Sequence, residues 1–434
     1  SGQTGSPVIK LGDVNGDGIA DFLITAHDAQ NTQGYETGAV YLVYGDSSWT
    51  DGGAHEFDLT DVTSSSTGGV KILAPESPWG SAYKVYWAEF GSGLSTAGDI
   101  DEDGYDDILI GYYNDSSLST TSNAYRRGSV FVIFGGDLAT AGTYDMADSH
   151  VYLKFYGHYN HDHSGTDVAS GDFDGDGHPD ILIGSKEGRI SYSEKNYGHV
   201  SLIYWMGWRT GGSTTSLATY SPYYSTPATS IKEISLGNAD ARFKGEYYKS
   251  KTGYAVASAG DVDADGYDDI LIGAYGAEFD SGSGTGSWGK AYLVYGSSTQ
   301  HTGSTINDAQ NRTEFLGDSS GSELKAGLDV SPAGDVDADD YPDILIGTFQ
   351  SSYAGYGYLI YGADGLENTS VDLGTAADVT LQGLTKTGST TYTYSRFTSG
   401  DFNGDGYSDV ILSTSRDENN KLKGLVYHLE GACQ

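Results

Sequence analysis

The most regular feature of the chain is a cluster of aspartates followed at once by a short apolar run. The pattern Gly-Asp-x-Asp/Asn-x-Asp-x-x-x-Asp occurs six times, with its first aspartates at positions 13, 99, 172, 261, 335 and 401. The apolar run behind each cluster, as at 107–111, is bounded by turn residues and rich in β-branched side chains, which predicts a buried strand. The intervals of 86, 73, 89, 74 and 66 residues leave no room for a hidden repeat of the same size.

Each repeat contains further apolar segments. Glycine-bounded aromatic and β-branched segments follow the acidic clusters at 38–45, 128–135, 198–205, 289–296, 355–362 and 423–431. A third segment precedes five of the clusters, as at 241–245 and 312–317, and a fourth such as 253–260 leads directly into a cluster. One unit therefore reads strand A, acidic loop, strand B, variable loop, strand C, loop, strand D, and no stretch shows helical periodicity. We predict an all-β chain whose units are four-stranded antiparallel blades of a β-propeller.

Two other repeat architectures share parts of this pattern. A solenoid stacks regular repeats, which the long and variable connections between these strands fit poorly. Tandem dockerin or EF-hand modules share the aspartate spacing, but they need a helix after the loop, whereas DILIG follows at once here.

The repeats resemble the FG-GAP family, which forms the propeller of integrin α subunits. The matching residues include Phe90-Gly91 before the second acidic cluster, Gly253-Tyr254 before the fourth, and Gly273-Ala274-Tyr275 where the family has Gly-Ala-Pro. The resemblance covers nearly the whole chain and implies an integrin-α-like β-propeller with Ca²⁺ in its acidic loops.

Six repeats predict six blades, whereas integrin-type propellers usually have seven, which is the alternative. We expect one propeller over 1–434, with approximate blades at 1–74, 75–155, 156–245, 246–317, 318–384 and 385–434. The last blade would lack its outer strand. Ser1 stands in what reads as the middle of a repeat, and no segment reads as a signal peptide, so we expect a piece of a larger polypeptide.

The spacing of the aspartates suits a hard cation. Carboxylates or amides at positions 1, 3, 5 and 9 of each loop, with the backbone carbonyl of position 7, form an oxygen-only shell for Ca²⁺, and glycine at position 6 permits the turn. The alternative to a Ca²⁺ site is an acidic turn that is solvated and binds no metal. The expected ligands are Asp13, Asn15, Asp17, Ile19, Asp21; Asp99, Asp101, Asp103, Tyr105, Asp107; Asp172, Asp174, Asp176, His178, Asp180; Asp261, Asp263, Asp265, Tyr267, Asp269; Asp335, Asp337, Asp339, Tyr341, Asp343; and Asp401, Asn403, Asp405, Tyr407, Asp409.

Three loops depart from this pattern. Asn15 and Asn403 keep an oxygen at position 3 but lose a charge. Asp340 replaces the glycine of position 6, where a left-handed backbone is costly for any residue with a Cβ. Of up to six Ca²⁺ sites, we therefore expect the one at Asp335–Asp343 to be the weakest or distorted.

The net charge limits the classes of partner that the chain can bind. The chain has 60 acidic and 23 basic residues and a formal net charge of −37, which argues against nucleic acid and anionic membranes. Twenty-two of the 60 carboxylates stand at the ligand positions, and six Ca²⁺ ions would bring −37 to −25. No run of about 18 apolar residues predicts a membrane span, and the single cysteine, Cys433, permits no internal disulfide.

Topology separates the acidic loops from other loops that could bind a ligand. In an antiparallel blade the A–B and C–D connections lie at one end of the strands, and the B–C and D–A connections lie at the other. The latter are rich in aromatic residues, which suit sugars and protein partners, although the more common role of any single one is to pack between blades or over neighbouring loops. The candidate ligand-binding residues are Trp79, Tyr83, Tyr86, Trp87, Tyr112, Tyr113, Arg126, Tyr159, Tyr248, Trp288 and Tyr353.

Two smaller motifs allow alternatives. The histidines between His158 and His163 could bind zinc, but loop histidines without a firm scaffold and a fourth ligand are usually solvated. Arg126 and Arg127 could bind a carboxylate or sulfate, or form exposed salt bridges.

These features favour a secreted or cell-surface, calcium-stabilised binding module, adhesin-like or lectin-like, that recognises a glycan or an extracellular protein. No Ser-His-Asp order, His-Glu-x-x-His motif or nucleophile elbow indicates an enzyme. A calcium-dependent polysaccharide hydrolase or lyase remains an alternative, because the off-loop carboxylates Glu89, Glu187, Glu246 and Glu278 cannot be paired from sequence alone. A structural spacer of a large surface protein is a third.

Overall fold

The computed structural model describes most of the repeats and part of their connections. The described residues are 4–27, 29–30, 36–47, 59, 62–63, 68–75, 89–116, 126–138, 140–146, 152–189, 191, 196–205, 232–280, 285–286, 288–303, 305–308, 311–317, 325–350, 356–366, 369–382, 393–403, 405–414 and 425–431. The chain divides into two compact units, Ser1–Ser170 with His178–Gly188 and Leu202–Asp240, and Gly171–Gly177 with Arg189–Ser201 and Ala241–Gln434.

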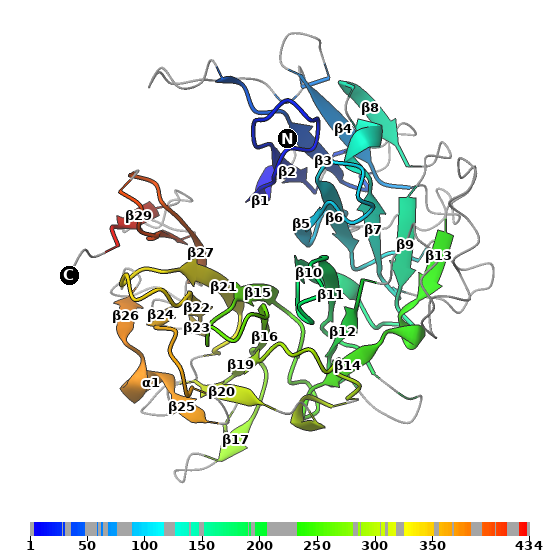
Figure 1. The fold of residues 1–434 in the computed structure, drawn as a ribbon. Coiled ribbons are helices and arrows are strands. Elements are labelled where there is room, and N and C mark those ends of the chain that lie inside the picture. Colours follow the sequence, from blue (N-terminus) through cyan, green and yellow to red (C-terminus); the bar gives the residue numbers. More distant parts are fainter. Residues whose placement is uncertain are drawn as a thin grey trace. The chain divides into compact units, whose positions relative to one another are not determined.

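The first unit contains two five-stranded sheets (Figure 1). The first sheet has the order β1-β2-β3-β4-β8, and the second has the order β13-β9-β7-β6-β5. Their strands are β1 (Thr4–Lys10), β2 (Phe22–Ala26), β3 (Ala39–Val43), β4 (Gly69–Leu73), β5 (Leu94–Gly98), β6 (Asp107–Tyr112), β7 (Ser129–Ile133), β8 (Gly142–Asp145), β9 (Tyr152–Tyr156) and β13 (Lys232–Ser235).

A third sheet has the order β10-β11-β12-β14. Its strands are β10 (Ser164–Gly171), β11 (Asp180–Ser185), β12 (His199–Ile203) and β14 (Ala241–Lys244).

The second unit contains three further large sheets, ordered β15-β16-β19-β20-β25, β21-β22-β24-β26 and β23-β27-β28-β29, and one small hairpin, β17-β18. The strands that lead into the acidic loops of these sheets are neighbours, since β15 lies beside β21 and β21 lies beside β27. The strands are β15 (Val256–Gly260), β16 (Asp269–Ala274), β17 (Phe279–Asp280), β18 (Thr285–Gly286), β19 (Lys290–Val294), β20 (Arg312–Leu316), β21 (Asp329–Gly334), β22 (Asp343–Gly347), β23 (Phe349–Gln350), β24 (Tyr356–Ile360), β25 (Ser370–Asp372), β26 (Val379–Gln382), β27 (Thr393–Gly400), β28 (Asp409–Thr414) and β29 (Leu425–Leu429).

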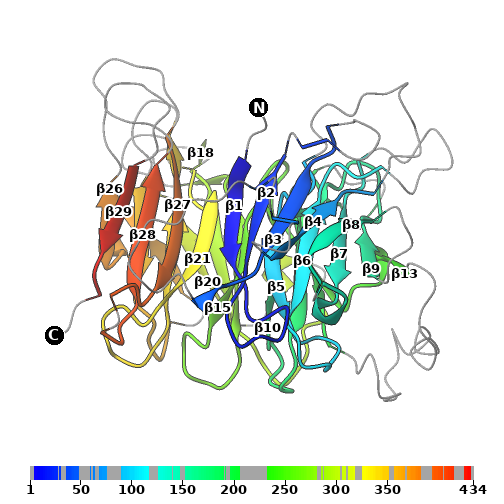
Figure 2. The ribbon, with the colours of Figure 1, turned by 90° about the horizontal axis from the view of Figure 1, so that it is seen from above.

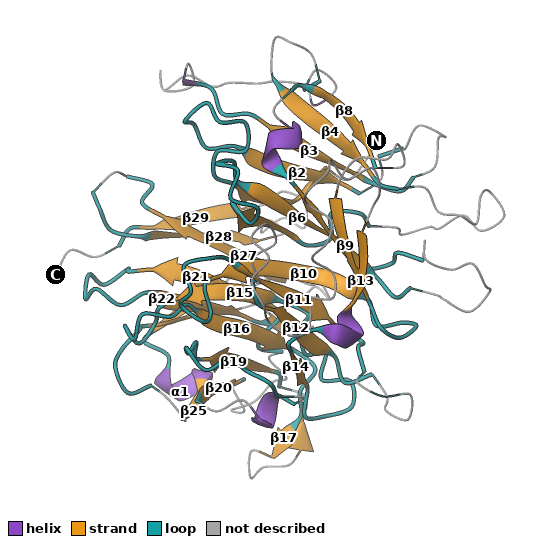
Figure 3. Ribbon diagram, turned by 45° about the vertical axis from the view of Figure 1, so that its right-hand side comes forward, coloured by secondary structure: helices purple, strands orange, loops and turns teal. Residues whose placement is uncertain are grey.

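The all-β prediction is confirmed, and the sheets are consistent with a β-propeller. The helical elements whose bounds are described are α1 (Leu373–Ala376) and the 3₁₀ turns Gly135–Leu138, Leu236–Asn238 and Ile306–Asp308, which Figure 3 shows as short purple segments between orange strands. In the part of the chain that the structure describes, no helix is long and apolar enough to cross a membrane.

Three sheets have a fifth strand, which corrects the expectation of uniformly four-stranded antiparallel units. β8, β13 and β25 each come from the connection between strands C and D of one repeat, yet they pair with strand D of the preceding sheet. Each pairing is parallel: β4 with β8, β9 with β13, and β20 with β25. These connections thus cover outer edges that would otherwise expose unpaired backbone groups.

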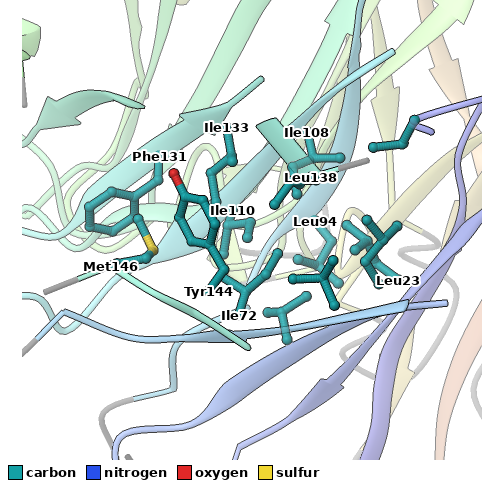
Figure 4. Packing of buried hydrophobic residues seen from close by; sticks show 14 of the residues in the cluster. Leu23, Ile72, Leu94, Ile108, Ile110, Phe131, Ile133, Leu138, Tyr144 and Met146 are labelled. Atoms are coloured by element: carbon teal, nitrogen blue, oxygen red, sulfur yellow. The ribbon is translucent and has the colours of Figure 1, made fainter. Parts of the chain in front are cut away.

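The apolar runs after the acidic loops are continuous because both faces of the central strands are buried. Every residue of β3, β6, β7, β11, β12, β16, β19 and β22 is buried. In β6, Ile108 and Ile110 pack into the core between the first two sheets, whereas Leu109 points to the other face and joins a different core cluster. Figure 4 shows the first of these cores, where side chains of β2, β4, β6 and β7 meet.

The acidic connection of the first sheet lies at one end of its strands, as the topology requires. Figure 2 shows β1 to β4 side by side, with the acidic connection from β1 to β2 at the lower ends of these strands. The register that pairs Lys10 with Phe22 closes this connection tightly. The acidic loop is therefore fixed at both of its ends by the sheet.

Candidate metal centres in the acidic loops

The first aspartate of each acidic loop folds the loop around its own carboxylate. In the second loop, Asp99 accepts hydrogen bonds from the backbone N–H groups of Asp103 (2.8 Å) and Gly104 (2.9 Å). Because the bonds run from positions 5 and 6 back to position 1, the intervening carboxylates turn toward one centre. The same pair of bonds is formed by Asp13, Asp172, Asp261, Asp335 and Asp401.

Three carboxylates converge in each of the four loops that have an aspartate at position 3. In each of these loops, one carboxylate oxygen per residue lies within 4.8 Å of the others. The groups are Asp99, Asp101 and Asp107; Asp172, Asp174 and Asp180; Asp261, Asp263 and Asp265; and Asp335, Asp337 and Asp339. Like charges at such distances repel unless a cation lies between them, and an all-oxygen set is what Ca²⁺ prefers.

The aspartate at position 3 of the loop supplies a direct test of whether these residues fit a cation. The Oδ1 atoms of Asp174 and Asp337 are buried, and neither has a hydrogen-bond partner among the described residues. A buried carboxylate oxygen without a partner is costly. A cation among the converging carboxylates would satisfy both atoms, so the residues present fit Ca²⁺.

The ninth position ties each loop to its sheet. Asp107 is fully buried, and its two carboxylate oxygens accept the backbone N–H groups of Ile100 (2.9 Å) and Gly135 (2.8 Å). Gly135 follows β7, so one side chain joins the acidic loop to the end of strand C. Equivalent pairs of bonds are formed by Asp21, Asp269, Asp343 and Asp409.

Burial disfavours the charged form of these ninth-position carboxyls. It raises the pKa of Asp107 and Asp269 to about 8, of Asp343 to about 7 and of Asp21 to about 6, with neighbouring loop carboxylates adding to the effect and the backbone N–H bonds opposing it. A nearby divalent cation reverses this balance, because it stabilises the ionised carboxylate.

The asparagines of loops one and six make these loops chemically different. Asn15 Oδ1 accepts the N–H of Asp17 (2.9 Å), and Asn15 Nδ2 donates to Asp17 Oδ2 (3.1 Å). Asn403 makes the same two bonds with Asp405. An amide donor thus lies at position 3, where the other loops have a carboxylate, and this favours weaker cation binding.

Two left-handed positions shape the loops, and the sequence analysis found one of them. The glycines of position 6 have positive φ as expected, for example 94° at Gly104, and Asp340 adopts 71° at the same place. Position 4 is left-handed as well, although it carries Glu102, Ala264 and Ala338 in three loops. The glycines at 16 and 175 were the available signal. The loop containing Asp340 keeps the same hydrogen bonds to Asp335, so its weaker affinity stays a prediction.

Neighbouring loops are joined through position 8, which the sequence analysis missed. Asp106 Oδ2 accepts the backbone N–H of Asp13 (2.8 Å), and Asp106 N–H donates to the Asp13 carbonyl (3.1 Å). Asp268 forms the same two bonds with Asp172. Since Asp13 and Asp172 are first-position residues, each clamp fixes a candidate ligand of the adjacent loop.

The candidate ligand-binding residues fall into three groups. Tyr112 (3% exposed) and Tyr159 (9%) are buried, and Tyr112 packs edge-on against Phe90, so both rings belong to the core. Tyr248 and Arg126 are exposed, and Tyr113 and Trp288 are half-buried. Trp79, Tyr83, Tyr86, Trp87 and Tyr353 lie outside the described residues.

Two histidines of the 158–163 cluster contact other residues of the fold. His163 is buried, which lowers its pKa to about 4, and its Nε2 lies 3.9 Å from Glu187. His158 Nδ1 lies 3.1 Å from the hydroxyl of Ser235. Among the described residues, no group of converging metal-binding side chains contains a histidine. Arg127 donates to Asn160 (3.2 Å).

Sheets of this kind, each carrying one aspartate-lined loop between its first two strands, define a class of all-β repeat proteins. The FG-GAP repeat family model matches residues 11–43, 90–133, 164–203 and 252–287, and each match contains one of the first four acidic loops. The chain therefore contains FG-GAP repeats, which confirms the resemblance seen in the sequence.

Curated relatives include integrin α subunits. The chain is 26% identical over 238 residues to integrin alpha pat-2 of Caenorhabditis elegans (45% of this chain, 18% of that protein) and 28% identical over 202 residues to integrin alpha-PS2 of Drosophila melanogaster (46% and 12%). It is also 26% identical over 260 residues to the phosphatidylinositol-glycan-specific phospholipase D of Dictyostelium discoideum (52% and 25%). The match thus spans at most a quarter of the length of these relatives.

Proposed function

We propose that this chain is an extracellular, calcium-stabilised binding module, adhesin-like or lectin-like, within a larger polypeptide. It recognises a glycan or an extracellular protein through the B–C and D–A connections, away from the acidic loops. Calcium binding is supported by one observation at two loops. Among the described residues, the Oδ1 atoms of Asp174 and Asp337 are buried without a hydrogen-bond partner, and both residues belong to groups of converging carboxylates. The integrin resemblance supports the extracellular part.

The metal has a structural role in this proposal. The ligands lie in loops that the ninth-position aspartates attach to strand C, so an ion held there stabilises the sheet as well as the loop. Up to six ions would bind, with the fifth loop and the two asparagine loops weakest. The ring would close with six blades, or with seven if the larger polypeptide supplies another.

The recognition surface is assigned to residues that remain accessible. Tyr113, Arg126, Tyr248 and Trp288 lie in B–C and D–A connections, and each is exposed or half-buried. Aromatic rings and an arginine are the side chains that most often dominate binding to sugars and proteins.

The enzyme alternative finds less support. Of the off-loop carboxylates, Glu246 binds Lys290 (2.9 Å) and Glu187 lies beside His163, so both have structural partners. The resemblance to the phospholipase D covers 25% of that enzyme, too little to transfer its activity. A spacer role would leave the exposed aromatic connections without a use.

Calcium removal tests the metal part. We expect EDTA to lower the melting temperature by more than about 10 °C and Ca²⁺ to restore it, because each occupied site adds about 2.7 kcal/mol when Ca²⁺ is a hundredfold above Kd. Differential scanning calorimetry of the whole chain measures this. An unchanged melt in EDTA contradicts calcium-dependent folding.

A glycan array and a panel of extracellular matrix proteins, each probed with Ca²⁺ and with EDTA, test the recognition part. Binding to members of one panel that is lost in EDTA supports the proposal and separates lectin from adhesin. Turnover of a polysaccharide by the pure chain, or no binding on either panel, contradicts it.

A further inference from the structure

The turn that joins β14 to β15 carries an exposed aromatic and cationic cluster in the second unit. Within this turn, residues 245–253, Tyr247 is 40% exposed, Tyr248 is 47% exposed, and Lys249 next to them is exposed as well. Lys249 Nζ lies 5.1 Å from the centroid of the Tyr248 ring. Two partly exposed rings and an ammonium group thus lie in one turn, which makes it a candidate binding surface.

The backbone of this turn is fixed from both sides. Lys249 N–H donates to the carbonyl of Asn196 (2.8 Å), and Ser250 Oγ donates to the carbonyl of Tyr197 (2.5 Å), both in the B–C connection of the third sheet. From the B–C connection of the fourth sheet, Gly276 N–H donates to the Ser250 carbonyl (3.0 Å). The exposed side chains therefore start from an ordered frame, which lowers the entropy cost of binding.

The lysines of the turn occupy conformations that glycine would adopt more easily. Lys249 has φ of 65° and Lys251 has φ of 57°. The corresponding turn of the first unit has the same conformation, with φ of 65° at His161 and 55° at His163, so the backbone is a property of the fold. A non-glycine residue costs roughly 1 kcal/mol at such a position. Lysine at both positions therefore carries a conformational cost that glycine would avoid.

The charge of the turn opposes that of the chain. The turn contains Lys249 and Lys251, and Arg242 and Lys244 precede it in β14, so positions 242–251 hold four of the 23 basic residues and one acidic residue, Glu246. The Glu246 carboxylate is bound to Lys290 Nζ at 2.9 Å. On a chain of net charge −37, this turn is a local cationic surface, and it favours an anionic ligand.

A second aromatic–lysine pair, Tyr275 with Lys325, lies next to the turn, and both of its residues are half-buried. Tyr275 precedes Gly276, which bonds to the turn, and its ring meets that of Tyr254 edge-on at 4.7 Å. Lys325 Nζ lies 5.9 Å from the centroid of the Tyr275 ring. Rings alternating with ammonium groups match a chain of pyranose units that bear acidic substituents, because the ring faces cover sugar C–H groups while the lysines bind the anions.

We propose that residues 245–253, with Tyr275 and Lys325, form a binding subsite for an acidic polysaccharide, whose carboxylate or sulfate groups bind Lys249 and Lys251 and whose sugar rings stack on Tyr247 and Tyr248. The inference rests on the proposed binding function and names its ligand class. An acidic peptide offers the anions but not the flat C–H faces, so the tyrosines favour a glycan.

The left-handed lysines allow a test in which folding and binding change in opposite directions. The double variant Lys249→Gly/Lys251→Gly is expected to melt at the same or a higher temperature than wild type, because glycine relieves the strained backbone. It is expected to bind acidic glycans about tenfold more weakly. Tyr248→Ala is expected to weaken the same binding at least about fivefold. Lys10→Ala, which removes an exposed charge on β1, is the control and should leave the affinity unchanged.

The probes are an oligogalacturonate, dextran sulfate, neutral dextran and polyglutamate, measured by calorimetry in Ca²⁺ with the whole chain. Binding to oligogalacturonate alone identifies carboxylate as the anion, and binding to dextran sulfate alone identifies sulfate; either result supports the subsite if both variants weaken it and dextran does not bind. Equal affinity for polyglutamate, an unchanged affinity in both variants, or no binding of either acidic glycan overturns it. In the last case, binding on the protein or neutral-glycan panels would leave the proposed function standing while this inference fails.

Discussion

Asp107 closes the second acidic loop and begins β6, and its carboxylate accepts two backbone N–H groups from different parts of the sheet. It also belongs to the group of converging oxygens with Asp99 and Asp101. A single buried side chain thereby connects a candidate metal site to the fold. Burial raises the pKa of Asp107, so its ionised carboxylate is destabilised when no cation is near.

This double role predicts that Asp107→Asn destabilises the chain even without metal. An amide has one acceptor oxygen, so one of the two N–H groups would face the amide nitrogen and lose its bond, at a cost of about 1–3 kcal/mol. Urea denaturation in EDTA measures the change. The matched control is Asp101→Asn, which copies the asparagine found at position 15 and should alter the Ca²⁺ dependence more than the stability in EDTA. Equal destabilisation by the two variants in EDTA would refute the structural role.

The fifth loop offers a second test at the scale of one residue. Asp340 has φ of 71°, where glycine avoids the Cβ clash. We expect Asp340→Gly to raise the free energy of unfolding by about 0.5–1 kcal/mol and to tighten Ca²⁺ binding at this loop.

The reverse change gives the control, since Gly266 has φ of 95° in the fourth loop and a Cβ there would meet no atom within 4 Å. Gly266→Asp should therefore lose a similar amount through backbone strain alone. Chemical denaturation and calcium titration of both variants compare them. A loss of stability in Asp340→Gly would show that its carboxylate matters more than its backbone.

At the scale of elements, the strands that carry the acidic loops are readable from sequence because each has its own apolar run. Ile108, Leu109 and Ile110 are buried on alternate faces, and that burial is visible as an unbroken hydrophobic stretch. The convergence of Asp99, Asp101 and Asp107 follows from their spacing. These features depend on residues close together in the chain.

Features that depend on distant residues could not be predicted. β8 and β25 are short, polar segments, and they become strands because the edge of another sheet pairs with them. Asp106 reads as one more acid of its loop, but its partner is Asp13, 93 residues away. Nor does the sequence distinguish the buried Tyr112 from the exposed Tyr248, because burial there depends on how connections of neighbouring repeats pack.

Strand β20 presents a charge network whose pH dependence can be predicted. Glu314 accepts hydrogen bonds from Arg312 (2.6 Å) and Lys290 (3.0 Å). Burial alone would raise the pKa of Glu314, but these two cations outweigh it and hold the pKa below its ordinary value of 4.5. Glu314 therefore contributes stability that is present above pH 4.5 and is lost as the pH falls through its lower folded value.

We expect Glu314→Gln to destabilise the chain by on the order of 2 kcal/mol near neutral pH and by progressively less in acid, since the wild type loses this contribution there. Urea midpoints measured against pH, for wild type and variant in EDTA, give the difference curve. Glu278→Gln, at an exposed position, should give a flat difference near zero. A constant penalty for Glu314→Gln down to strong acid would contradict the ion-pair assignment.

At the scale of the whole molecule, the net charge and the binding of metal are linked. A chain with 60 acidic and 23 basic residues repels itself, and 22 of the acids are concentrated at the candidate ligand positions. Filling six loops with Ca²⁺ would change the net charge from −37 to −25 and would place the positive charge where the repulsion is strongest. Salt screening should therefore matter most when calcium is removed.

The expected result is that NaCl raises the melting temperature of the EDTA-treated chain more steeply than that of the calcium-loaded chain. Monovalent ions screen exposed carboxylates over about 10 Å at 0.1 M, but they cannot supply ligand bonds inside the loops, so salt should recover only part of the stability that Ca²⁺ provides. Calorimetric melts over a range of NaCl with EDTA or Ca²⁺ compare the two slopes. Equal slopes would mean that the aspartate clusters are not a source of repulsion in the folded chain. Full recovery by NaCl alone would mean that screening, rather than coordination, accounts for the calcium effect.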